Sequence, residues 1–165
     1  VAQLAGAITG AILVFVFYKP HYDATDNAVA KLATFCTAPN IRALPYNFFG
    51  EAAATFVLVY SVLLMVDPTF TIELAGVKGE IPVGLGSIGA LPVGLIVFAI
   101  GLSLGGTTGY AINPARDLGP RIAHFLLPIK DKRDSDWSYA VIPVLGPIAG
   151  GVLAAMLFLS HTAMG

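Results

Sequence analysis

The stretch with the clearest chemical character is Asn113-Pro114-Ala115-Arg116-Asp117, which places an amide, a guanidinium and a carboxylate between long apolar runs. Asn113 is a good helix N-cap, and Pro114 suits the first helical position, where its missing N–H is no loss. The pattern predicts a short helix from Pro114 to about Leu127. The unpaired N–H groups and the positive dipole end of this helix would face whatever lies beyond Asn113.

The composition around this stretch is that of a membrane protein. Of the 165 residues, 56% are hydrophobic and 12% are charged, whereas roughly a quarter are charged in an ordinary soluble domain. A net charge of −1 and scattered basic residues argue against nucleic-acid binding. The single cysteine, Cys36, excludes an intramolecular disulfide or a multi-cysteine metal site. We expect no metal and no cofactor, and the scattered histidines, without a Ser/His/Asp or Cys/His arrangement, argue against an enzyme.

Four apolar runs approach the roughly 20 residues that a helix needs to cross the hydrocarbon core. They comprise residues 1–18, 47–66, 84–104 and 139–160, and Pro92 interrupts the third. The helix predicted over 114–127 would be about 20 Å long, too short to cross. From the residues alone it is either a helix in a soluble loop or a re-entrant half-helix that lines a watery path.

The segments between these runs carry less information. Residues 19–46 are polar, contain three prolines and lack a helical period, so we predict a long loop that either covers a pore mouth or simply connects. Residues 67–82 are predicted to be a connector. Lys78 is its only basic residue, so the loop charges place it outside the cell. Val1 lies within an apolar run without signal-peptide features, and we expect the natural start upstream.

Two polar residues within the predicted spans, Glu51 and Gln3, are candidates for a specific role. Glu51 lies about one turn inside the second run, and an ionisable group at membrane depth is a functional candidate by default. It is otherwise a carboxylate near a helix end that reaches water, and its position alone does not decide between the two. For Gln3, in the first run, we favour an interhelical hydrogen bond over pore lining.

The motif Asn113-Pro114-Ala115-Arg116, preceded by Gly109-Tyr110 and set between two spans, resembles the second pore motif of the aquaporin (major intrinsic protein) family. The resemblance covers nearly the whole chain. The other residues that carry it, where the family's third to sixth helices have similar residues, are Gln3 with Ala5-Gly6-Ala7, Glu51 with Thr55, Gly101 through Gly109, and Ile142-Pro143 with Gly146-Pro147.

This resemblance implies an all-α membrane protein with an aquaporin-like right-handed helical bundle. The family fold has six tilted helices plus two half-helices in two inverted repeats. Residues 1–165 would form a single partial domain with four transmembrane helices and one re-entrant half-helix, 114–127. The first two helices, the first half-helix and its own Asn-Pro-Ala motif have no counterpart, so these residues alone should not enclose a channel. The resemblance also implies a multi-pass protein of the plasma membrane, a homotetramer, and a cytoplasmic 67–82 connector, against the loop charges.

The resemblance also implies roles for individual residues. Asn113 would donate a side-chain N–H to a permeant, backbone carbonyls would accept hydrogen bonds, and Arg116 would donate at the narrowest point and repel cations. The implied sets are a selectivity filter of Arg116, Tyr110 and Gly101, a pore motif of Asn113, Pro114 and Ala115, pore-lining carbonyls of Gly109, Tyr110 and Ala111, and loop braces at Glu51 and Asp117.

The implied solute follows from the filter. Gly101 stands where water-selective members resemble one another in having a histidine, and this leaves room for a carbon chain. Four further residues agree with the glycerol facilitator branch: Asp117, Arg121, Pro143 and Val144. We therefore predict a passive channel for glycerol, similar small polyols and water, in contact with membrane lipid. The alternatives are a water-selective aquaporin, a coupled transporter with a broken helix and a non-conducting fragment.

Overall fold

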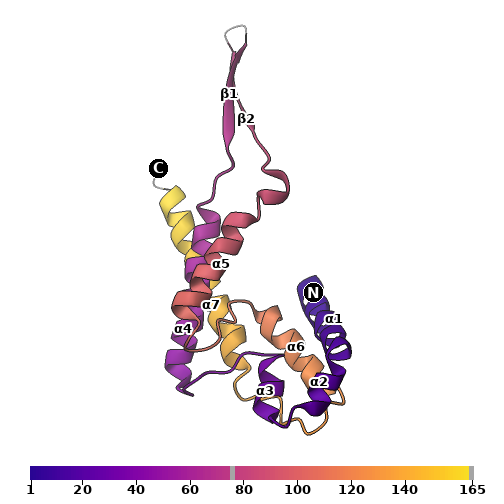
Figure 1. The fold of residues 1–165 in the computed structure, drawn as a ribbon. Helices are drawn as coiled ribbons and strands as arrows, with labels where there is room; N and C mark the ends of the chain where they lie inside the picture. Colours follow the sequence, from indigo (N-terminus) through magenta and orange to yellow (C-terminus); the bar gives the residue numbers. More distant parts are fainter. Residues whose placement is uncertain (75–76, 164–165) are drawn as a thin grey trace.

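The computed structural model describes residues 1–74 and 77–163, which form a helical bundle with one β-hairpin (Figure 1). The elements in chain order are α1 (Ala2–Phe17), α2 (Lys19–Ala24), α3 (Ala28–Ala33), α4 (Leu44–Leu63), β1 (Thr69–Leu74), β2 (Val77–Pro82), the 3-10 helix η1 (Gly86–Ile88), α5 (Leu91–Leu104), α6 (Pro114–Leu126) and α7 (Val141–Thr162).

Helices α4, α5 and α7 run side by side, and α1 packs along α6 (Figure 1). Glycines set the close approach between these helices. A Cβ added at Gly150 of α7 would lie 2.1 Å from the carbonyl oxygen of Ala52 in α4, and one at Gly119 of α6 would lie 2.6 Å from Ala7 Cβ in α1. Only a residue without a side chain lets the two backbones pack at this distance.

The predicted start of α6 is confirmed. Asn113 is the N-cap, and its Oδ1 accepts hydrogen bonds from Ala115 N at 2.9 Å and Arg116 N at 3.4 Å. Pro114 occupies the first helical position. The helix ends at Leu126, and Leu127 is already extended because a residue before proline, here Pro128, disfavours the helical conformation.

The observed helices differ from the predicted spans in length and position. In the described part of the chain, α4 and α7 are long and apolar enough to cross a membrane, whereas α1 and α5 are apolar but have 16 and 14 residues. The prediction for 84–104 is wrong in its first part, because the helix begins only at Leu91. Pro92 lies in the first turn of α5 and does not interrupt it, and Pro45 likewise lies in the first turn of α4.

The prediction of a long loop without helices over 19–46 is also wrong, because α2 and α3 lie there. Asn27 caps α3 by accepting hydrogen bonds from Val29 N and Ala30 N, both at 3.0 Å. Each helix has six residues, too few to show a helical period and too short to be stable alone. Packing supports them, since Tyr22 and Phe35 join a buried cluster with Phe15, Ala123 and Ile129.

The connector predicted over 67–82 contains an antiparallel hairpin, so the chain is not entirely α-helical. Phe70 pairs with Ile81, and Thr71 pairs with Glu80. The hairpin extends beyond the ends of α4 and α5 (Figure 1). Its first strand, Thr69–Leu74, alternates polar residues with apolar ones, which favours a strand with two unlike faces. That signal was present in the sequence and was missed.

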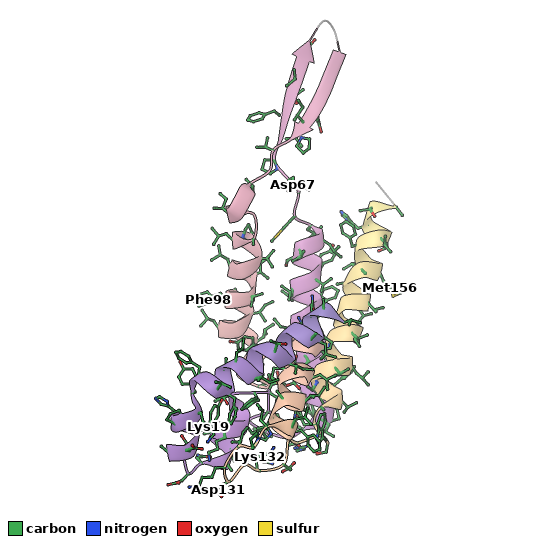
Figure 2. All side chains as sticks on the ribbon, turned by 90° about the vertical axis from the view of Figure 1, so that its right-hand side faces the viewer. Lys19, Asp67, Phe98, Asp131, Lys132 and Met156 are labelled. Carbon is green, nitrogen blue, oxygen red and sulfur yellow. The ribbon has the colours of Figure 1, made fainter. Side chains whose placement is uncertain are left out.

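Labelled charged residues lie beyond the two ends of the helical part of the molecule, and exposed apolar side chains lie between them (Figure 2). Lys19, Asp131 and Lys132 gather at one end, and Asp67 lies at the opposite end of the helices, where the hairpin begins. Between them, Phe98 is 64% exposed and Met156 is 62% exposed on the outer faces of α5 and α7. Exposed apolar side chains between two charged ends are typical of a membrane protein.

Candidate functional site

The loop between α5 and α6, residues 105–113, has an unusual backbone. Tyr110 has φ 41°, Ile112 has φ 43° and Gly109 has φ 79°. Glycine adopts this left-handed region freely, but each non-glycine residue pays about 1–3 kcal/mol. A β-branched residue such as Ile112 is particularly unfavourable there. The loop therefore needs specific contacts to hold this conformation.

Glu51 of α4 supplies two of those contacts. Its Oε1 accepts a hydrogen bond from Ala111 N at 2.9 Å, and its Oε2 accepts one from Ile112 N at 2.8 Å. The side chain is 1% exposed, so Glu51 faces the protein interior and does not reach water. Hydrogen bonds to an ionised acceptor are roughly twice as strong as neutral ones, and these two oppose the strain at Tyr110 and Ile112.

The carbonyl groups of this loop are left without internal partners. In residues 1–74 and 77–163, the carbonyl oxygens of Gly109, Tyr110 and Ala111 accept no hydrogen bond. The adjoining N–H groups of Ala111 and Ile112 are turned toward Glu51. A cavity of about 240 Å³ lies beside the loop, and its lining residues are Leu58, Val97, Tyr110, Ala111, Ile112, Asn113 and Arg116.

The cap of α6 orients the Asn113 amide. Because Oδ1 accepts from the first-turn N–H groups, the amide nitrogen is directed away from the helix. The amide nitrogen lies 3.5 Å from Gln3 Oε1, which is at the long limit of a hydrogen bond. Gln3 thus approaches α6 from α1 at the level of Asn113, and the amide N–H groups remain able to donate into the cavity.

Two arginines of α6 have opposite surroundings. Arg116 is exposed and lines the cavity, and its guanidinium has no ion-pair or hydrogen-bond partner in the described part of the chain. Arg121 is fully buried, and its Nε donates to Asp117 Oδ1 at 2.8 Å. It also donates to the carbonyl oxygens of Ser135 and Asp136 at 2.8 and 2.9 Å. Arg116 is therefore free to bind a solute, and Arg121 is not.

Asp117 belongs to the buried network and does not line the cavity. Besides Arg121, its Oδ2 accepts from Thr37 N at 2.7 Å and from Thr37 Oγ1 at 2.6 Å. Thr37, Ser135 and Asp136 were not identified from the sequence, because a threonine, a serine and an aspartate in polar connectors carry no spacing signal of their own.

Tyr110 is seated on the glycine face of α5. A Cβ added at Gly101 would lie 3.2 Å from Tyr110 Cζ, and one at Gly105 would lie 2.5 Å from Tyr110 Cδ1. The space that Gly101 leaves is thus occupied by the aromatic ring. Gly101 acts on the cavity through the position of Tyr110, whose ring is part of the cavity wall.

A lysine side chain caps the C-terminal end of α6. Lys132 Nζ donates to the carbonyl oxygens of His124, Phe125 and Leu127 at 2.7, 2.8 and 2.7 Å, which satisfies carbonyls that the helix leaves unpaired and complements its negative dipole end. Burial lowers the pKa of Lys132. His124 is fully buried, and its Nδ1 lies 2.8 Å from Ser135 Oγ, which fits a structural role.

Comparison with known proteins identifies the family. The model of the family "Major intrinsic protein" matches residues 1–158. The chain belongs to the major intrinsic protein family. It is 51% identical over 157 residues to glycerol uptake facilitator protein 3 of Lactiplantibacillus plantarum, covering 95% of this chain and 60% of that protein. It is 47% identical over 163 residues to the probable glycerol uptake facilitator protein of Thermotoga maritima, covering 95% and 61%.

A solved structure supports the same assignment. The X-ray structure of the aquaglyceroporin from Plasmodium falciparum matches with a TM-score of 0.73 and 30% identity, covering 95% of this chain and 60% of that one. This chain of the major intrinsic protein family therefore has an aquaporin-like helical fold and is a membrane protein. The resemblance found in the sequence, including the glycerol facilitator branch, is confirmed. The chain spans about 60% of the length of the curated relatives it matches.

Proposed function

We propose that the protein is a passive transmembrane channel for glycerol and similar small neutral solutes, with water. The observation that carries this proposal is the cavity in which the Tyr110 ring, the unpaired Arg116 guanidinium and the Asn113 amide meet. Glycerol has a carbon backbone on one side and hydroxyls on the other. Tyr110, with Leu58 and Val97, suits the carbon backbone, and the two polar side chains suit the hydroxyls. The names of the relatives agree with this solute.

In this proposal the solute passes in single file along α6 and its preceding loop. The unpartnered carbonyls of Gly109, Tyr110 and Ala111 accept hydrogen bonds from hydroxyls, while Asn113 and Arg116 donate. These groups replace the hydration shell of a neutral polyol. The positive N-terminal end of α6 and the charge of Arg116 disfavour cations and protons. The Asn-Pro-Ala motif of residues 113–115 thereby provides both polarity and a capped helix.

Glu51 and Asp117 act as braces for this path. Glu51 holds the inner side of the loop through Ala111 and Ile112, and Asp117 ties the first turn of α6 to Arg121 and Thr37. Neither carboxylate lines the cavity, so neither is assigned a contact with the solute.

We further propose that α1, α4, α5 and α7 are transmembrane helices and that α6 is a re-entrant half-helix. Together they form one partial channel domain, residues 1–165, within the right-handed six-plus-two bundle. The length of α4 and α7 and the apolar surface of α1 and α5 support this arrangement. In the complete natural protein, the other half of the pore wall would be formed by a segment that corresponds to the part of the full-length relatives that residues 1–165 do not cover. The protein is a multi-pass homotetramer of the plasma membrane, with the hairpin in the cytoplasm, and it is not an enzyme.

The alternatives predict different features. A water-selective aquaporin would carry a bulky polar residue at position 101, where glycine seats the Tyr110 ring. A coupled transporter would need a carboxylate free to bind an ion, and both oxygens of Glu51 are used by backbone N–H groups. A non-conducting fragment is the expectation for the 165 residues without the remainder of the channel.

The test uses the complete natural protein in proteoliposomes. Vesicle shrinkage and recovery are followed by stopped-flow light scattering, first with an impermeant osmolyte for water and then with glycerol. We expect glycerol permeability well above that of protein-free vesicles, together with water permeability. Water flux without glycerol flux would contradict the proposal and favour the water-selective alternative. Vesicles holding only residues 1–165 are expected to behave like protein-free ones.

A further inference from the structure

Residues 37–40, here called the strap, run antiparallel along the loop that precedes Tyr110. At one end, Asn40 N donates to Thr107 O at 3.2 Å and Asn40 Nδ2 donates to Gly106 O. At the other end, a Cβ added at Gly109 would lie 3.5 Å from both Cβ and Cγ2 of Thr37. The strap thus backs residues 106–109.

Thr37 also binds the first turns of α6. Its N–H and its hydroxyl both donate to Asp117 Oδ2, at 2.7 and 2.6 Å, and its carbonyl accepts from Arg121 Nη2 at 3.0 Å. Thr37 is 6% exposed, and Asp117 and Arg121 are fully buried. Charge-assisted hydrogen bonds in a buried setting hold a defined geometry. Thr37 therefore connects the loop before α6 to the helix itself.

The two attachment points of Thr37 are next to the two sides of the proposed filter. Gly109 precedes Tyr110, and Asp117 follows Arg116. Thr37 does not line the cavity that those two side chains share. We infer that Thr37 is a positioning residue, which sets the separation between the Tyr110 ring and the Arg116 guanidinium and so determines how well a polyol is selected over water. This inference rests on the proposed glycerol channel.

The expected effect differs between solutes. Glycerol must contact the aromatic wall and the guanidinium at the same time, so its passage depends on their separation. Water needs only hydrogen-bond partners and is less sensitive to a small displacement. A loosened strap should therefore lower glycerol permeability more than water permeability, and a change in this ratio is not expected from a simple loss of folded protein.

The decisive variant is Thr37→Val, which keeps the shape and the backbone N–H but removes the hydroxyl donor. In proteoliposomes of the complete protein, we expect the ratio of glycerol to water permeability to fall about fivefold. The reason is that loss of the hydrogen bond from Thr37 Oγ1 to Asp117 Oδ2 loosens the placement of the Tyr110 ring and the Arg116 guanidinium. Thr37→Ser retains the hydroxyl and should recover most of the ratio. Asn40→Ala, at an exposed residue, should cause a smaller fall in the same direction and remains informative if Thr37→Val does not fold.

Thr34→Val is the matched control. Thr34 Oγ1 lies 2.7 Å from both Tyr22 OH and Lys31 O, so this substitution removes hydroxyl contacts of the same kind three residues away from Thr37 without touching the loop or α6. We expect its permeability ratio to match that of the unmodified protein. If both Thr37→Val and Asn40→Ala conduct glycerol with an unchanged ratio of glycerol to water permeability, the positioning role of Thr37 is overturned and the channel proposal is not. Failure of the unmodified protein to conduct glycerol would instead overturn the channel proposal.

Discussion

Replacement of Glu51 by glutamine tests how the strained loop is held. The carboxylate accepts two backbone hydrogen bonds, at 2.9 and 2.8 Å, each worth about 1.5–3 kcal/mol because the acceptor is charged. The left-handed conformations of Tyr110 and Ile112 cost about 1–3 kcal/mol each, so brace and strain are of similar size. A glutamine has one acceptor oxygen and an NH2 group that cannot accept. We therefore expect Glu51→Gln to shift the free-energy difference between the braced loop and a relaxed loop by about 2–4 kcal/mol in favour of the relaxed loop.

The assay compares transport with folding. Each 1.4 kcal/mol is a factor of about ten, so Glu51→Gln should lower glycerol permeability at least about tenfold in proteoliposomes of equal protein density. Thermal stability should fall by less than this free-energy shift of the loop, because relaxation of the loop releases the strain at Tyr110 and Ile112 and a buried neutral amide costs less to desolvate than a carboxylate. Glu80→Gln, an exposed carboxylate of the hairpin, is the control and should leave transport unchanged. Full glycerol permeability in Glu51→Gln would refute the reasoning.

Three further predictions follow from the packing and from burial. Gly150→Ala places a Cβ 2.1 Å from Ala52 O and should destabilise the protein by about 2 kcal/mol or more. Gly151→Ala is the control, because its Cβ would meet only Val59 Cγ2 at 3.9 Å, and it should not destabilise the protein. Thermal unfolding of both variants checks this. Gly101→His must displace the Tyr110 ring, so stopped-flow assays should show glycerol permeability falling far more than water permeability; equal losses would contradict the assignment. Burial raises the pKa of the Cys36 thiol to about 12, so at pH 8 its thiolate is scarce and maleimide labelling, followed by mass spectrometry, should require unfolding; rapid labelling of the folded protein would argue against this burial.

Local rules accounted for the parts of the site that depend on near neighbours in the chain. The N-cap at Asn113, the proline at the first helical position and the end of α6 before Pro128 follow from steric and hydrogen-bond requirements within a few residues. The same rules applied to Pro45 and Pro92 would have placed the starts of α4 and α5 correctly. Pro92 was interpreted as an interruption of a span and Pro45 as part of a loop, although both suit a first turn. The hairpin was not predicted, because residues 67–82 were interpreted as a connector although the alternation of polar and apolar residues in Thr69–Leu74 favours a strand.

The sequence by itself determined that this is a membrane protein of the major intrinsic protein family, where α6 begins, and which side chains carry charge beside it. The family resemblance assigned Arg116 to the filter, but the two residues alone could not show which arginine is free, because Arg116 and Arg121 are chemically identical and differ only in their surroundings. The tertiary structure decided that, by bringing Asp117 and Thr37 together across 80 positions and Glu51 and Ala111 across 60. Buried backbone groups and charges must find partners wherever the fold provides them, and partners so distant in the chain leave no local pattern.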